Sequence, residues 1–137
     1  SALIPPSQLL ERITRNHAQG AEGATWTDRE FELTRSGVEH GHSVSIRIEP
    51  GFRYTFIAIS EDWTDIRSTL LAGTLILAQE TSPNYYSVIT ANPPIFGYDA
   101  TLTVYTPQEV SGQPSKIRFR ILQAPVEPPA EQAAGGE

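Results

Sequence analysis

The stretch FRYTFIAIS, residues 52–60, decides the fold of this chain. Its first apolar residues occupy alternate positions and therefore share one face of an extended strand: Phe52, Tyr54, Phe56 and Ala58. Ile57 and Ile59 make the second half apolar on the opposite face as well. An apolar pattern on both faces predicts a strand in the centre of a sheet, with Phe56 in the core.

Shorter segments with the same period of two lie on both sides of this strand. The alternation starts at Trp26. The segments follow in chain order at 31–34, 43–49, 66–72, 74–80, 85–90, 100–104 and 117–121. Turn residues such as Pro50-Gly51 separate them at intervals of about 8 to 12 residues, a spacing typical of sandwiches and barrels. We therefore predict an all-β fold, an antiparallel and jelly-roll-like β-sandwich of about eight strands.

The N-terminal residues have a different period. Residues 7–17 place Leu9, Leu10 and Ile13 on one face of a helix, with Ser7 as its expected N-cap. This apolar stripe is too short to be stable alone in water and needs a surface to cover it. That surface is either another chain or the sandwich itself.

The C-terminal residues PVEPPAEQAAGGE have no apolar periodicity and predict an extended tail. Such a tail offers little apolar area for docking on its own domain, so we expect it to contact other chains. The predicted organisation is thus an N-terminal arm with a short helix (1–24), a β-sandwich domain (25–124) and a C-terminal tail (125–137).

Composition excludes several classes of function. The 10 Lys and Arg against 16 Asp and Glu give a net charge of -6, which makes nucleic acid a poor partner. No apolar run approaches the roughly 18 residues of a membrane-spanning helix. The chain has no Met, and the small residues Ser1 and Ala2 could follow a signal-peptide cut, although removal of an initiator Met would leave the same end. We expect an exported protein, located in the periplasm, at the cell surface or outside the cell.

The sequence contains no complete catalytic motif. Gly41-His42-Ser43-Val44-Ser45 lacks the second glycine of a nucleophile elbow, and Ser43 opens an alternating strand instead of a turn before a helix. Phosphate loops, dinucleotide fingerprints and zinc spacings are also missing from the sequence. The sequence therefore predicts a protein that is not an enzyme.

Two groups of residues are candidates for metal binding. Glu61, Asp62 and Asp65 cluster between two predicted strands and supply the oxygen ligands that Ca²⁺ prefers, and Asp65 would be held best. Their spacing fixes no geometry, and solvated turn residues are the alternative. His40 and His42 are two apart and would share one side of a strand, or they simply face water at a hairpin tip.

Aromatic residues gather at predicted strand ends, among them Trp63, Tyr85 and Tyr86. Flat rings at the rim of a sandwich suit sugar or protein binding, because they offer a large contact area at low entropic cost. Closing the ends of the core is the alternative role. These three residues are the candidate ligand site.

The order of several segments resembles the bacterial pre-peptidase C-terminal domain family, a β-sandwich module of secreted proteins. The matching segments are Ile48-Glu49-Pro50-Gly51-Phe52-Arg53-Tyr54-Thr55-Phe56, then Asp65-Ile66-Arg67-Ser68-Thr69-Leu70, then Pro94 to Gly97 before Ala100-Thr101-Leu102-Thr103-Val104. Arg67 stands where the family commonly has a second acidic residue, and Tyr98 directly follows Gly97 without the usual spacing. The resemblance implies a non-catalytic accessory or adhesive role.

Two functions follow as hypotheses. The first is a structural or accessory subunit of an exported assembly that acts through protein–protein contacts with the same or different chains, with contact residues Leu9, Leu10, Ile13, Pro128 and Pro129. The second is a secreted module that binds carbohydrate or a protein ligand, with Ca²⁺ as a possible stabiliser and no other cofactor.

Overall fold

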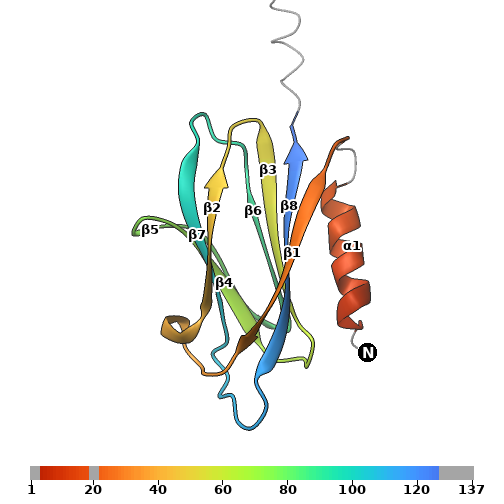
Figure 1. Ribbon diagram of the computed structural model, residues 1–137, viewed down its shortest axis with the longest axis vertical. Coiled ribbons are helices and arrows are strands. Elements are labelled where there is room, and N and C mark those ends of the chain that lie inside the picture. Colours follow the sequence, from red (N-terminus) through yellow and green to blue (C-terminus); the bar gives the residue numbers. More distant parts are fainter. Residues whose placement is uncertain (1–3, 19–21, 127–137) are drawn as a thin grey trace, which may run out of the picture.

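The computed structural model describes residues 4–18 and 22–126, which form two antiparallel four-stranded sheets packed face to face with one helix on the outside (Figure 1). The strands are β1 (Thr25–Leu33), β2 (His42–Ile48), β3 (Phe52–Ser60), β4 (Ile66–Ala72), β5 (Leu75–Asn84), β6 (Tyr86–Ala91), β7 (Tyr98–Tyr105) and β8 (Ser115–Pro125). Their order is β1-β8-β3-β6 in one sheet and β2-β7-β4-β5 in the other. This is the order of a jelly roll, and it confirms the predicted fold class.

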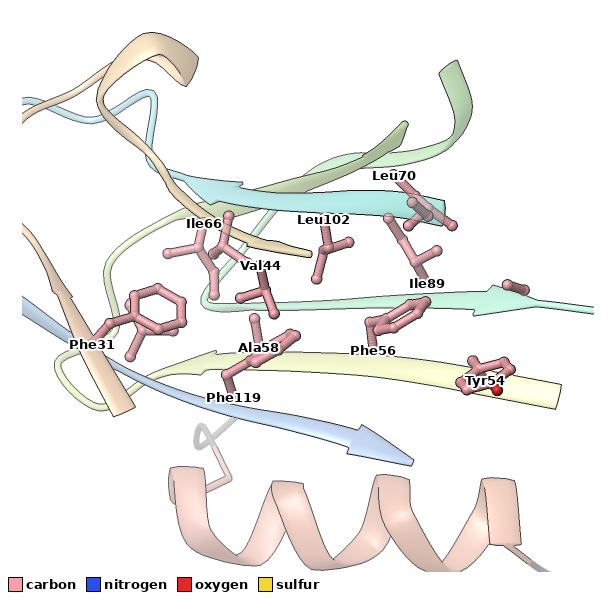
Figure 2. Close-up of a cluster of buried hydrophobic side chains, with 14 of the residues drawn as sticks. Phe31, Val44, Tyr54, Phe56, Ala58, Ile66, Leu70, Ile89, Leu102 and Phe119 are labelled. Carbon is pink, nitrogen blue, oxygen red and sulfur yellow. The ribbon is translucent and has the colours of Figure 1, made fainter. Parts of the chain in front are cut away.

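Strand β3 has the central place that its sequence predicts, since it pairs with β8 on one side and β6 on the other. Tyr54, Phe56 and Ala58 point between the sheets and are buried. Figure 2 shows them facing Val44, Ile66, Leu70 and Leu102 of the opposite sheet, with the helix on the far side of β3. The prediction that Phe56 lies in the core is confirmed.

Helix α1 (Pro6–Ala18) explains why β3 is apolar on its second face. Leu9, Leu10 and Ile13 are buried against Ile57 and Ile59, which point away from the main core. The sandwich itself, and not another chain, therefore covers the apolar stripe. The prediction that these three residues contact other chains draws no support from this placement, because their side chains are already covered.

The start of α1 differs from the prediction in one detail. The helix begins at Pro6, so Ser7 lies inside the first turn instead of capping it. Proline suits the first helical position because its fixed φ is helical and its missing N–H would be unpaired there in any case. The amide of Leu9 donates to the carbonyl of Pro5 at 3.0 Å and closes the first turn.

A buried arginine fastens the helix to the sheet. Arg120 of β8 makes two hydrogen bonds to the carboxylate of Asp28, at 2.6 and 2.8 Å. It also donates to the hydroxyl of Thr14 on the helix at 3.0 Å and approaches Glu11 at 3.5 Å. The guanidinium lies 5.0 Å from the ring centre of Trp26. Arg120 alternates with Phe119 and Ile121 in the sequence of β8, and this pattern alone gives no sign that a helix buries it.

Backbone pairing defines where the sandwich ends at the C-terminal end of β8. Gly51 has φ of 85°, which the turn after Pro50 requires and which glycine adopts readily. Pro125 still pairs with Phe52, and the amide of Val126 donates to the carbonyl of Gly51. Pro128 and Pro129 lie outside the described residues. Within the described ranges, no helix has the length and apolar character needed to cross a membrane.

Candidate functional site

The three aromatic residues singled out in the sequence come together in the fold, although they lie in separate segments. Trp63 is in the loop after β3, whereas Tyr85 and Tyr86 lie where β5 passes into β6. The rings of Trp63 and Tyr85 meet edge to face with their centres 4.9 Å apart, and those of Tyr85 and Tyr86 with their centres 5.3 Å apart. We call these three residues the aromatic cluster.

The members of the aromatic cluster differ in exposure. Tyr85 and Tyr86 are half-buried and pack against the apolar side chains that α1 and β3 bury between them. The Tyr85 hydroxyl donates to the carbonyl of Ile4 at 2.8 Å. Trp63 is 42% exposed, which is high for a large apolar side chain. The two tyrosines thus form a fixed base, and the indole is the part that a ligand can reach.

Trp63 also has an unusual backbone conformation. Its φ is 65°, and it is the one residue other than glycine with a positive φ in the described part of the chain. This region is unfavourable for a bulky side chain and costs on the order of 1 kcal/mol or more. Residues in such conformations persist only where their surroundings hold them in place.

The neighbours of Trp63 supply that support. The carboxylate of Asp62 accepts hydrogen bonds from the hydroxyls of Ser60 at 2.5 Å, Ser115 at 2.7 Å and Thr64 at 3.1 Å. The Ser60 hydroxyl oxygen in turn accepts from the amides of Asp62 and Thr64. Residues on both sides of Trp63 are therefore tied to the ends of β3 and β8.

This network also sets the charge state of Asp62. Partial burial alone would raise the pKa of its carboxyl group, but the hydrogen bonds from Ser60, Ser115 and Thr64 outweigh burial and leave the pKa below its usual value. Asp62 is consequently ionised at neutral pH, and the turn that presents Trp63 stays locked.

A polar cavity of about 240 Å³ lies beside this turn. Asp62 and Thr64, the two neighbours of Trp63, line it together with Ser115 at the start of β8 and residues of the loop between β7 and β8: Gln108, Glu109, Val110, Ser111 and Gln113. Its wall is made mostly of hydroxyl, amide and carboxylate groups. The loop residues were not predicted from the sequence, because a polar loop between two strands looks like any solvated turn.

The acidic residues proposed as Ca²⁺ ligands have separate partners. Glu61 pairs with Arg118 at 3.0 Å, and Asp65 pairs with Arg67 at 3.3 Å. Asp62 is engaged by the three hydroxyls. In the described ranges, no three His, Cys, Asp or Glu side chains are grouped closely enough to hold a metal ion. The short spacing along the sequence therefore does not bring the three carboxylates to one point.

The remaining candidates also have ordinary surroundings. Ser43 exchanges a hydrogen bond of 2.8 Å with Thr103 across the sheet. His40 ends a short 3-10 helix (Val38–His40), whereas His42 lies on β2 and stacks on Phe31 at 4.1 Å. Partial burial lowers the pKa of His42, and Arg29 adds to this effect. The metal hypothesis requires both histidines to lie on one strand, and they do not.

Comparison with known proteins gives similarity at the level of the fold. No family model matches the chain, and no curated protein matches its sequence. The pre-peptidase C-terminal domain of a collagenase from Bacillus anthracis is similar to it in structure, with a TM-score of 0.47 and 12% identity over 69% of this chain and 87% of that one.

Two further solved structures are similar to a lesser degree. A CBM4 structure has a TM-score of 0.42 and 13% identity over 79% of this chain and 81% of that one. An acetyl xylan esterase from the rumen bacterium Butyrivibrio proteoclasticus has a TM-score of 0.42 and 10% identity over 76% of this chain and 34% of that one.

Proposed function

We propose that this domain is a non-enzymatic accessory module that acts outside the cytoplasm and binds a neutral carbohydrate at the aromatic cluster. The observation that carries the proposal is Trp63, an exposed indole held at an unfavourable φ of 65° by hydrogen bonds on both sides of it. Backbone strain kept in place by a dedicated network is typical of residues that position a side chain for binding.

The chemistry around Trp63 favours a polyhydroxylated ligand. One face of a sugar ring carries mainly C–H groups, which can pack on the indole, and the ring's hydroxyl groups need hydrogen-bonding partners nearby. Gln108 and Gln113 of the adjoining cavity offer amide donors and acceptors, and Glu109 offers a carboxylate. An anionic ligand would be repelled by Asp62 and Glu109, so an uncharged one is favoured.

The proposal is tested by titrating the purified chain with a panel of neutral and acidic polysaccharides and measuring the heat of binding by calorimetry, a signal that Trp63→Ala does not remove. We expect a neutral polysaccharide to bind and Trp63→Ala to weaken binding at least about tenfold, since an aromatic anchor at the centre of a contact typically contributes more than 1.4 kcal/mol.

Phe96→Ala is the matched control, because Phe96 is an exposed aromatic residue outside the aromatic cluster. The Phe96→Ala chain should bind the neutral polysaccharide with the affinity of the wild type. The proposal fails if no neutral polysaccharide binds, or if binding is the same for Trp63→Ala and the wild type.

A further inference from the structure

Strand β5 begins with an apolar segment that the rest of the described chain leaves uncovered. It is an edge strand, hydrogen-bonded to β4 on one side, and no strand of the described residues pairs with its other side. Leu75, Ile76 and Leu77 are 64%, 54% and 39% exposed. Figure 1 shows the β5 end of the hairpin reaching out from the sandwich, away from α1.

This edge lacks the charges that protect another edge strand of the molecule. Free edges invite pairing with other chains, and proteins commonly block them with charged side chains. Edge strand β1 carries Asp28, Arg29, Glu30 and Glu32. Residues 68–79, STLLAGTLILAQ, contain no charged residue, and the first charge on β5 is Glu80.

The pattern of residues 75–78 is that of a strand covered on both faces. Leu75, Ile76, Leu77 and Ala78 are apolar without alternation, which is usual for strands inside a sheet and unusual for an edge. The pairing with β4 shifts at this point: Ile76 and Ala78 have partner residues in β4, and within the described chain Leu77 has none there. Among the described residues, the free edge of this uncharged segment is therefore open to pairing with an additional strand.

We propose that the missing strand is β5 of a second copy of this chain, paired antiparallel about a two-fold axis between Ile76 and Leu77. In this register Leu75 lies opposite Ala78 and Ile76 opposite Leu77, so every residue of the run faces an apolar partner. Glu80 falls opposite Gly73, and the two Glu80 side chains stay apart. A two-fold contact must be complementary to itself, and this four-residue run satisfies that condition.

The absence of charge in this segment removes one obstacle to a second copy pairing there. Each chain carries a net charge of -6, so two copies repel each other over most of their surfaces. The stretch 68–79 carries no charged side chain, so pairing along it places no like charges opposite each other. Pairing there would join the two β2-β7-β4-β5 sheets into one sheet of twice the width.

Disulfide trapping tests the register directly, because the chain has no cysteine of its own. Residues directly opposite in antiparallel strands have Cα atoms about 4.5 to 5.5 Å apart, within reach of a disulfide. An equimolar mixture of Ile76→Cys and Leu77→Cys chains should therefore form mixed disulfide dimers faster than either variant alone, because each residue faces the other in the partner. Val38→Cys, an exposed apolar position elsewhere, is the control. Equal rates for the mixture and the control would overturn the proposed pairing.

Sedimentation analysis over a range of concentrations tests self-association without cysteines. We expect the full chain to form a dimer, and Ile76→Lys to raise its dissociation constant about tenfold or more, because a lysine would be buried opposite Leu77. Val38→Lys should dimerise like the wild type. A wild-type chain that remains monomeric throughout, or an Ile76→Lys chain that dimerises normally, contradicts the proposal; the first result would leave a different protein as the only candidate partner for β5.

Discussion

Helix α1 and the start of strand β5 each carry two leucines and one isoleucine, and the fold buries one set and leaves the other exposed. The stripe of α1 (Leu9, Leu10 and Ile13) is buried by the outer face of β3. The run that opens β5 (Leu75, Ile76 and Leu77) remains exposed. Both segments need a covering surface, and within the part of the chain that the structure describes only the helix has one.

The two segments differ in the residues that pack against them. The stripe of α1 meets Ile57 and Ile59, which a sheet packed on one face would otherwise leave in water. Its position is then fixed by polar contacts, since Arg120 bonds to Thr14 on the helix and to Asp28 on β1. Among the described residues, the start of strand β5 has neither a second apolar layer nor a polar lock. An apolar pattern thus shows that a segment needs burial, and its neighbours decide whether burial occurs within the chain.

The largest expected effect is a loss of stability from a change in the core between the two sheets, which supports both segments. Phe56 is buried between the two sheets and shares a face with Tyr54 and Ala58. Phe56→Ala should lower the free energy of unfolding by about 3 to 5 kcal/mol, because it removes buried apolar surface and leaves a cavity. Urea unfolding measures this change. A loss below about 1 kcal/mol would contradict the assigned facing of β3.

A pair of isoleucines compares the two segments themselves. Ile57→Ala should cost about 2 to 5 kcal/mol, because the helix seals that side chain from water. Ile76→Ala should change the stability of the monomer by no more than about 0.5 kcal/mol, because the side chain is exposed. Urea melts at low protein concentration give both values. If the two substitutions cost the same, α1 is not packed on the sheet in solution and the contrast between the segments is lost.

The sequence predicted the parts of the fold that depend on local pattern. The period of two located β3 with its ends at Phe52 and Ser60, and the pattern of the other strands predicted about eight strands, in agreement with the eight in the described residues. The apolar residues Ile57 and Ile59 indicated a covered second face, but the pattern did not identify α1 as the cover. That step depends on a contact between residues about 50 positions apart, for which a single sequence carries no signal.

The candidate site was predicted only in outline. Trp63, Tyr85 and Tyr86 were selected because they flank strands, and the fold brings their side chains together. The same reasoning grouped Glu61, Asp62 and Asp65 as metal ligands, whereas arginines and hydroxyls engage them separately. Ser115, which bonds to Asp62, lies more than 50 residues away on β8. Spacing along the chain shows which residues are near one another, and it does not show the direction in which each side chain points.

The smallest expected effect concerns the polar lock of α1 and is seen as a dependence on pH. The hydrogen bonds from Arg120 lower the pKa of Asp28, burial opposes them to a smaller extent, and the charges of Arg120 and Arg118 lower it further. A carboxyl group with a lower pKa in the folded state stabilises the fold above its unfolded pKa of about 3.9, and this contribution is lost as the pH falls through the folded value. Asp28→Asn should therefore be less stable than the wild type at pH 7, and the difference should shrink as the pH falls below about 4. Asp62 titrates in the same range but is present in both proteins, so it cancels in the difference. Asp99→Asn, which alters an exposed pair with Arg47, is the control and should follow the wild type. A difference for Asp28→Asn that stays constant from pH 7 to about pH 2 would show that the charge of Asp28 does not contribute to the lock.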